Sequence, residues 1–117
     1  MTIRTGEELL EEARSKIREV SAGDAMREAG PDTVFLDCRE QNEWNLGHIP
    51  GAVFLPRGNL ESKVEALIPR EKRVIVYCRS GNRSVFATQT LEQMGYESVA
   101  SMKGGIGGWA DAGGEIE

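Results

Sequence analysis

Short apolar segments alternate with amphipathic segments along the chain, and this alternation restricts the possible folds more than any other feature of the sequence. The apolar runs that have the length of buried strands cover residues 33–38, 52–55, 73–77 and 98–100. Apolar residues recur at helical spacing over 60–68, which Asn59 can cap, and over 84–94, which Gly95 ends. Six glycines between positions 104 and 114 indicate a loop and one short helix. The alternation predicts an α/β fold with a mostly parallel central sheet and helices on both faces.

The N-terminal part of the chain carries its own helix signals. The segment Thr5–Glu8 has the sequence of a capping box, and the apolar spacing behind it predicts an amphipathic helix over residues 6–18. A shorter helix is expected to follow over residues 21–30. We therefore divide the chain into an N-terminal helical extension, residues 1–19, and a domain, residues 20–117.

Composition and charge exclude several classes of protein. The chain has 117 residues, of which 39% are hydrophobic and 28% are charged, as in one globular domain of ordinary size. Its net charge of −5 disfavours nucleic-acid binding, and no apolar run approaches the roughly 20 residues that cross a bilayer, so we expect neither a nucleic-acid nor a membrane partner. The N-terminal residues lack the apolar stretch of a secretory signal, so we expect a cytoplasmic protein with two reduced cysteines. One histidine and two separated cysteines offer no metal-ligand spacing, so no metal is expected.

A cysteine stands where the third apolar run ends and the next helix begins. The loop reads Cys78-Arg79-Ser80-Gly81-Asn82-Arg83-Ser84. Its backbone N–H groups can converge into an anion-binding nest, which Gly81 permits, and the helix N-terminus adds partial positive charge. Arg79 and Arg83 bring full charges, and residues 70–83 carry a local charge of +4. These effects favour a reactive thiolate at Cys78 and a small anionic ligand over the alternative, an inert buried thiol.

Three separated segments of the chain resemble the rhodanese family of sulfurtransferases, from about Val20 to Ile116. They are Leu36-Asp37-Cys38-Arg39-Glu40 with Glu43-Trp44 and Gly47-His48-Ile49-Pro50-Gly51-Ala52, the loop from Cys78 to Ser84, and Met102-Lys103-Gly104-Gly105-Ile106 with Trp109 and Ala112-Gly113. The resemblance implies the three-layer rhodanese-like fold, and it implies that Cys78 is the catalytic residue that accepts a sulfane sulfur and becomes a persulfide. The sequence departs from the family at Cys38, where a valine is commonest, and in the tail, where Gly114-Glu115 replaces the usual proline.

The resemblance also implies the substrates and the residues that bind them. The expected donor-binding residues are Arg79, Ser80, Gly81, Asn82, Arg83 and Ser84. The implied donor is a small anionic sulfur compound, thiosulfate or a persulfide, and the acceptor is cyanide, a thiol or an acceptor protein; no cofactor is implied. The six residues from Cys78 to Arg83 have the loop length that family members use for sulfur, whereas related phosphatases and arsenate reductases have one residue more. We expect Arg83→Ala to raise the apparent KM for thiosulfate.

Four other polar residues have expected supporting roles. Asp37 ends a strand and is expected to hold the neighbouring Cys78 loop through backbone N–H groups. Arg39 and Glu43 stand four residues apart and are expected to pair on one helical turn. His48, the only histidine, lies in a turn-rich stretch, which favours a structural role over pairing with Cys78.

Cys38 has two possible roles. Cys38 and Cys78 each follow a valine by four residues at the end of a predicted strand, so neighbouring strands would place both thiols at one edge of the sheet. Cys38 could then resolve a Cys78 persulfide by forming a disulfide and expelling sulfide. The alternative, a small apolar side chain that fills the position of the valine, is favoured because disulfide geometry is demanding.

Three rival functions stay open at this stage. One is a sulfur-carrier or regulatory module that passes its persulfide to a partner protein and turns over small donors slowly. Another is a phosphatase or arsenate reductase, which the short loop disfavours. A noncatalytic interaction domain is the least favoured, because the chain keeps the cysteine.

Overall fold

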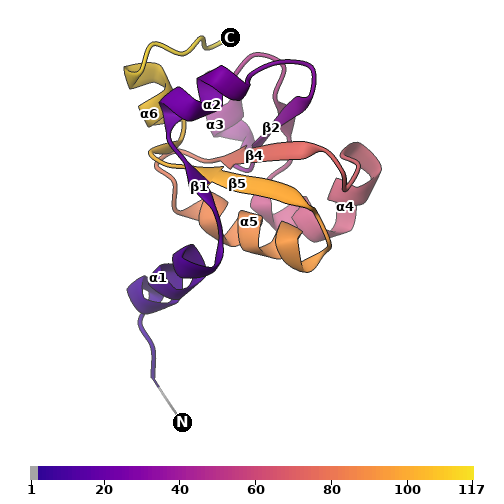
Figure 1. Ribbon diagram of the computed structural model, residues 1–117. Coiled ribbons are helices and arrows are strands. Elements are labelled where there is room, and N and C mark those ends of the chain that lie inside the picture. The colour runs from indigo at the N-terminus through magenta and orange to yellow at the C-terminus, as the bar shows by residue number, and fades with distance from the viewer. Residues whose placement is uncertain (1–2) are drawn as a thin grey trace.

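Five parallel strands form the central sheet of the computed structural model, which describes residues 3–117 (Figure 1). The strands are β1 Glu19–Val20, β2 Thr33–Asp37, β3 Val53–Phe54, β4 Arg73–Tyr77 and β5 Ser98–Met102. Their order across the sheet is β1-β5-β4-β2-β3, and every neighbouring pair is parallel. The predicted α/β fold with helices on both faces of a mostly parallel sheet is confirmed.

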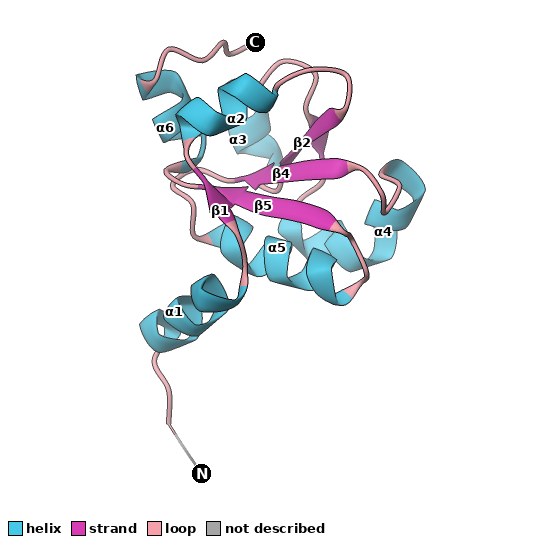
Figure 2. Cartoon of the chain, viewed as in Figure 1, coloured by secondary structure: helices cyan, strands magenta, loops and turns pink. Residues whose placement is uncertain are grey.

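The helices lie in two layers with the strands between them (Figure 2). They are α1 Gly6–Lys16, α2 Ala22–Glu28, α3 Gln41–Asn45, α4 Leu60–Leu67, α5 Arg83–Gln93 and α6 Gly105–Asp111, with a 3₁₀ turn at Arg57–Asn59. Side chains of α4 and α5 pack against one face of the sheet around Leu36 and Val76. Side chains of α2 and α6 pack against the other face around Phe35 and Ile75. Alternate residues of β2 and β4 thus enter opposite cores, as expected for strands that are buried on both faces.

The N-terminal helix begins as the sequence predicts and ends earlier. The Thr5 hydroxyl accepts a hydrogen bond from the Glu8 backbone N–H at 3.0 Å, and the Glu8 carboxylate accepts one from the Thr5 N–H at 3.0 Å, which completes the capping box. The helix stops at Lys16 because β1, which the sequence analysis missed, pairs with β5 at the sheet edge. Helix α1 packs against α5 and buries Ala13, below the rest of the domain in Figure 1.

Two details of local structure differ from what the sequence indicated. Asn59 precedes α4, but its side chain makes no capping hydrogen bond because the 3₁₀ turn at Arg57–Asn59 leads directly into the helix. The short helix α3 was not foreseen, since its five residues are too few for a clear apolar period.

The sheet topology brings the ends of β2 and β4 together. These strands are neighbours in register, with Asp37 opposite Tyr77. Cys38 and Cys78, the next residue of each strand, therefore leave the sheet side by side at its carboxyl edge, where ligands of parallel sheets bind. No helix within residues 3–117 has the length and apolar character needed to cross a membrane.

Candidate active site

Cys78 lies at the end of β4, and its sulfur faces hydrogen-bond donors of the loop behind it. The backbone N–H of Gly81 donates to the Cys78 Sγ at 3.1 Å, and that of Ser84 donates at 3.4 Å. The Ser84 Oγ lies 3.5 Å from the same sulfur. The expected nest of loop donors is therefore present, and it points at the Cys78 sulfur.

The nest changes the acidity of the thiol. Burial raises the pKa of Cys78, whose side chain is only 1% exposed, but the hydrogen bonds from the Ser84 hydroxyl and from the N–H groups of Ser84, Gly81 and Ser80 outweigh the effect of burial. The net pKa of Cys78 lies below the ordinary value of a thiol. A lowered pKa increases the thiolate fraction at neutral pH, and the thiolate is the nucleophilic form.

Glycines fix the path of the loop where it meets the start of α6. Gly81 has φ +100°, and a Cβ there would come within 3.1 Å of the Gly104 nitrogen. Gly105 has φ +56°, and a Cβ there would lie 2.3 Å from the Cys78 carbonyl oxygen. That carbonyl accepts a hydrogen bond from the Ile106 N–H at 2.9 Å. The glycine-rich segment before and within α6 thus supports the active-site loop from behind, a role that the sequence analysis did not assign to it.

The charge of Arg83 is neutralised by Glu43 of α3. Two hydrogen bonds, of 2.7 and 2.8 Å, join the guanidinium to both carboxylate oxygens. The ion pair lowers the pKa of Glu43 to about 2, and the hydrogen bond from Arg83 is the largest cause. The expectation that Arg39 pairs with Glu43 is wrong, because tertiary folding brings Arg83 to this carboxylate from 40 residues away. Arg83 therefore brings less positive charge to the site than its position in the sequence indicated.

Arg79 differs from the neighbouring arginines in its contacts. Arg70 pairs with Glu65 and Arg73 with Glu28, but Arg79 forms no ion pair with any of residues 3–117. It lines a hollow of about 330 Å³ beside the Cys78 loop. The other residues of the hollow are Arg39, Glu43, Leu46, Ile106 and Gly107. A larger hollow of about 430 Å³ lies by Trp109 and contains no residue of the Cys78 loop.

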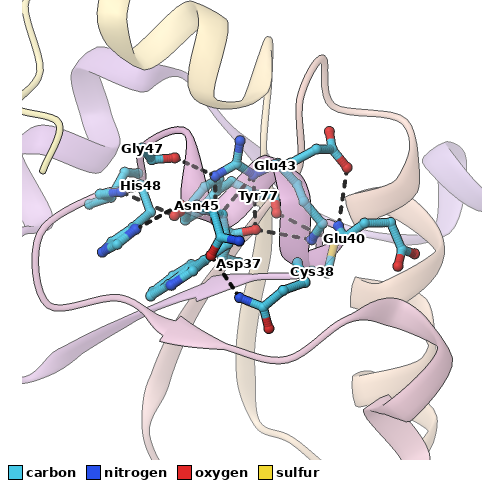
Figure 3. A network of polar contacts seen from close by, with 12 residues as sticks. Asp37, Cys38, Glu40, Glu43, Asn45, Gly47, His48 and Tyr77 are labelled. Carbon is cyan, nitrogen blue, oxygen red and sulfur yellow. Dashed lines mark hydrogen bonds and ion pairs between the residues drawn. The ribbon is translucent and has the colours of Figure 1, made fainter.

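Asp37 and Arg39 form a buried ion pair rather than a support for the Cys78 loop. Asp37 is 0% exposed and accepts hydrogen bonds from the Arg39 backbone N–H at 3.0 Å and from its guanidinium at 2.8 Å. The guanidinium also donates to the Gly47 carbonyl at 2.7 Å, as Figure 3 shows beside Asp37 and Tyr77. The expected contact of Asp37 with N–H groups of the Cys78 loop is absent from the hydrogen bonds of residues 3–117, because Arg39 occupies the carboxylate. The pair holds the Gly47 turn, and Arg39 reaches the hollow.

The environment of Cys38 is apolar, in contrast to that of Cys78. Its thiol donates to the Tyr77 carbonyl at 3.4 Å, and the residue is 1% exposed. Burial is the largest cause that raises the pKa of Cys38 well above its ordinary value. Cys38 is thus held as a neutral thiol within the core that contains Leu36 and Val76, which favours the packing role over a resolving role.

The other end of the loop contacts the N-terminal helix. Asn82 accepts a hydrogen bond at 3.1 Å from the guanidinium of Arg14, which also pairs with Glu19 at 2.6 Å. Ser80 and Asn82 are exposed, so their side chains stand at the surface of the loop. The contact with Arg14 could not be predicted from the sequence, because no local pattern links residues that are 68 positions apart.

His48 and Trp109 occupy structural positions. The His48 ring stacks on Trp44 with 3.5 Å between ring centroids, and its Nδ1 lies 3.2 Å from the Trp44 carbonyl oxygen. The Trp109 indole packs edge-on against Phe35 and donates to the Glu115 carbonyl at 2.8 Å. Within residues 3–117, no three His, Cys, Asp or Glu side chains are grouped as metal ligands.

Comparisons with known proteins agree with this geometry. Residues 21–112 match the model of the rhodanese-like domain. The chain is 39% identical to a sulfurtransferase from Allochromatium vinosum over 68% of this chain and 73% of that protein. It is 31% identical to the putative sulfur carrier protein YrkF from Bacillus subtilis over 92% of this chain and 58% of that protein.

A solved structure covers the whole chain. It is a protein of unknown function from Rhodopseudomonas palustris, described as a possible tyrosine phosphatase, with 36% identity, a TM-score of 0.87 and coverage of 100% of this chain and 98% of that one. Other relatives are much longer: the chain spans 21% of the length of probable adenylyltransferase/sulfurtransferases from Mycobacterium tuberculosis. The match to the domain model over most of its length shows that this chain belongs to the rhodanese-like domain family.

Proposed function

We propose that the chain is a sulfurtransferase that carries a sulfane sulfur on Cys78. In the first step the Cys78 thiolate attacks the outer sulfur of thiosulfate, the S–S bond of the donor breaks, and sulfite leaves with the bonding electron pair. In the second step a cyanide ion or a thiolate takes the outer sulfur of the persulfide, and the thiolate of Cys78 is restored. The observation that carries the proposal is the convergence of the Gly81 and Ser84 N–H groups on a sulfur of lowered pKa.

The loop is proposed to bind the donor through residues 79–84. Because the Cys78 side chain is only 1% exposed, a small anion reaches the sulfur more easily than a bulky one. Arg79 lines the hollow beside the Cys78 loop and has no ion-pair partner among residues 3–117, whereas Arg83 is paired with Glu43. Arg79→Ala is therefore expected to raise the KM for thiosulfate by about two- to fivefold, and Arg83→Ala is expected to raise it less. The difference between the two variants should shrink at high salt.

Steady-state kinetics test this proposal. Thiocyanate formation from thiosulfate and cyanide should show parallel double-reciprocal lines, the pattern of a ping-pong mechanism, and should vanish in Cys78→Ser. Cys38→Val is the matched control, because it removes the other thiol and should leave turnover unchanged. Turnover that persists in Cys78→Ser, or that is lost in Cys38→Val, would refute the assignment of Cys78 as the nucleophile.

A sulfur carrier is the second candidate. The observation that favours it is the 31% identity to a putative sulfur carrier protein over 92% of the chain. A carrier would load one sulfur on Cys78 and keep it, with slow release to cyanide and rapid release to a specific acceptor protein. The rate of sulfur loading is compared with the rate of thiocyanate formation: loading that is much faster than thiocyanate formation favours the carrier, and similar rates favour the sulfurtransferase.

A phosphatase is a third candidate because of the description of the Rhodopseudomonas palustris protein. The loop from Cys78 to Arg83 has six residues, one fewer than the loop of the related phosphatases, which disfavours this candidate. Hydrolysis of an aryl phosphate that is lost in Cys78→Ser would favour the phosphatase over both sulfur-transfer functions.

A further inference from the structure

A chain of buried hydroxyl groups continues from Cys78 into the protein interior. The Ser84 Oγ lies 3.5 Å from the Cys78 sulfur on one side and 2.8 Å from the Ser101 Oγ on the other. Ser84 is on the first turn of α5, Ser101 is on β5, and both residues are 0% exposed. Neither hydroxyl is exposed to bulk solvent, and each lies within hydrogen-bond distance of the other.

The direction of the hydrogen bonds follows from counting hydrogens. Each serine hydroxyl has one hydrogen to donate. The only side-chain hydrogen bond of Ser101 within residues 3–117 is the one to Ser84. If Ser84 donated to Ser101, the Cys78 thiolate would lose a donor and the hydrogen of Ser101 would have no partner. If Ser101 donates to Ser84, the hydrogen of Ser84 points to the thiolate and every group is satisfied.

We propose that Ser101 is a positioning residue, which donates to Ser84 and thereby directs the Ser84 hydroxyl hydrogen toward the Cys78 thiolate. The inference rests on the proposed nucleophilic role of Cys78. A hydrogen bond accepted by a hydroxyl also polarises the hydrogen that the same hydroxyl donates, so Ser101 strengthens the Ser84 bond to the thiolate. Ser101 touches no reacting atom and acts only through Ser84.

Other groups near Cys78 act on it independently of the Ser84 and Ser101 hydroxyls. They are Cys38 from the end of β2 and Arg83 of α5 with its partner Glu43 of α3, while Arg79 is the next residue along the loop. Thr88 provides an internal control, because it lies one turn after Ser84 on α5, is 0% exposed, and its hydroxyl has no hydrogen-bond partner within residues 3–117. A substitution of Thr88 that removes its hydroxyl therefore removes a buried hydroxyl of α5 that is not part of the Cys78–Ser84–Ser101 hydrogen-bond chain.

The test measures the pH dependence of Cys78 alkylation by iodoacetamide in the full-length chain, with the modified peptide identified by mass. At a pH below the pKa of Cys78, Ser101→Ala should slow alkylation about threefold and Ser84→Ala up to about tenfold, because each change weakens the hydrogen bonding of the thiolate. The double variant should match Ser84→Ala, and Thr88→Val should match the wild type. An unchanged profile in Ser101→Ala, or a further slowing when it is added to Ser84→Ala, would overturn the proposal.

A second measurement needs no substitution. The Cβ carbon resonance of Ser101 in the wild type should titrate with the same apparent pKa as Cys78, since the two are linked through Ser84; a pH-independent resonance would contradict the relay. Alkylation requires no sulfur donor, so the proposed function and the proposed role of Ser101 can be refuted independently of each other. If thiosulfate fails to load Cys78 while Ser101→Ala still shifts the alkylation profile, the proposed function is wrong and the role of Ser101 stands.

Discussion

Cys78 and Cys38 show how strongly local contacts determine what a cysteine does. Both are 1% exposed and leave neighbouring strands of one sheet edge, but hydrogen bonds lower the pKa of Cys78 while burial raises that of Cys38. We predict that iodoacetamide modifies Cys78 and leaves Cys38 unmodified at neutral pH in the folded protein. Peptide mass analysis reads the result, and equal labelling of both cysteines after unfolding is the control. Native labelling of Cys38 would show that its thiol is accessible and reactive.

The Glu43–Arg83 pair gives a second prediction for single residues, in the pH dependence of stability. Folding lowers the pKa of Glu43 from 4.5 to about 2, so the stabilisation is complete above about pH 5 and is lost as the pH falls toward 2. Glu43→Gln should therefore reduce the free energy of unfolding at pH 7 by about 1 kcal/mol or less, because the side chain of Arg83 is 40% exposed. Near pH 2 the variant and the wild type should unfold alike. A constant difference from pH 7 to pH 2 would exclude the ion pair as its cause.

At the scale of elements, α6 and the loop after β4 depend on one glycine. A Cβ at Gly105 would lie 2.3 Å from the Cys78 carbonyl oxygen, at a φ of +56°. Gly105→Ala is expected to reduce the free energy of unfolding by about 2 kcal/mol or more and to displace the loop, since strain at positive φ and a backbone clash add. Gly107→Ala is the matched control, because its Cβ would meet the Arg79 oxygen at an ordinary 3.6 Å. Thermal unfolding of the two variants should differ clearly, and equal stability would mean that the loop tolerates the displacement.

Helix α1 contacts the active-site loop at one point. Arg14 donates to Asn82 at 3.1 Å, so we propose that the extension over residues 1–19, whose first two residues lie outside the described structure, steadies the loop from the outside. Arg14→Ala should lower kcat/KM for thiosulfate about two- to fivefold, the value of one partly exposed hydrogen bond. Lys16→Ala, which breaks a pair with Glu12 inside the same helix, should leave kcat/KM unchanged. If both variants behave alike, the contact with Asn82 has no role in catalysis.

The helices and strands also show how much of the fold can be predicted from the sequence. The long apolar runs predicted β2 and β4, and with them the position of the Cys78 loop between β4 and α5, because such runs are visible within a short stretch of sequence. β1 and α3 were missed, since two and five residues carry too little pattern. The partners of Arg39 and Arg83 were missed for another reason: helical spacing favoured Arg39–Glu43, whereas Arg39 pairs with Asp37, two residues before it, and folding brings Arg83 to Glu43 from 40 residues away. Ion pairs between distant segments leave no period in a single sequence.

For the whole molecule, the strand order β1-β5-β4-β2-β3 explains the position of the candidate active site. β4 is the central strand, so the loop behind it is flanked by the ends of β2 and β5. β2 contributes the Asp37–Arg39 pair, and the residues after β5 contribute the glycines that support the loop. Ion pairs neutralise most of the local basic charge that the sequence showed, so we propose that the hydrogen-bond donors of the loop, with Arg79, bind the anionic donor.

We propose that Cys78 accepts a sulfane sulfur, and the intact mass of the protein after thiosulfate treatment tests this proposal most directly. We expect a mass increase of one sulfur atom in the wild type and in Cys38→Val, no increase in Cys78→Ser, and loss of the added mass on treatment with cyanide. No added sulfur on the wild type, or the same addition in Cys78→Ser, would contradict the claim.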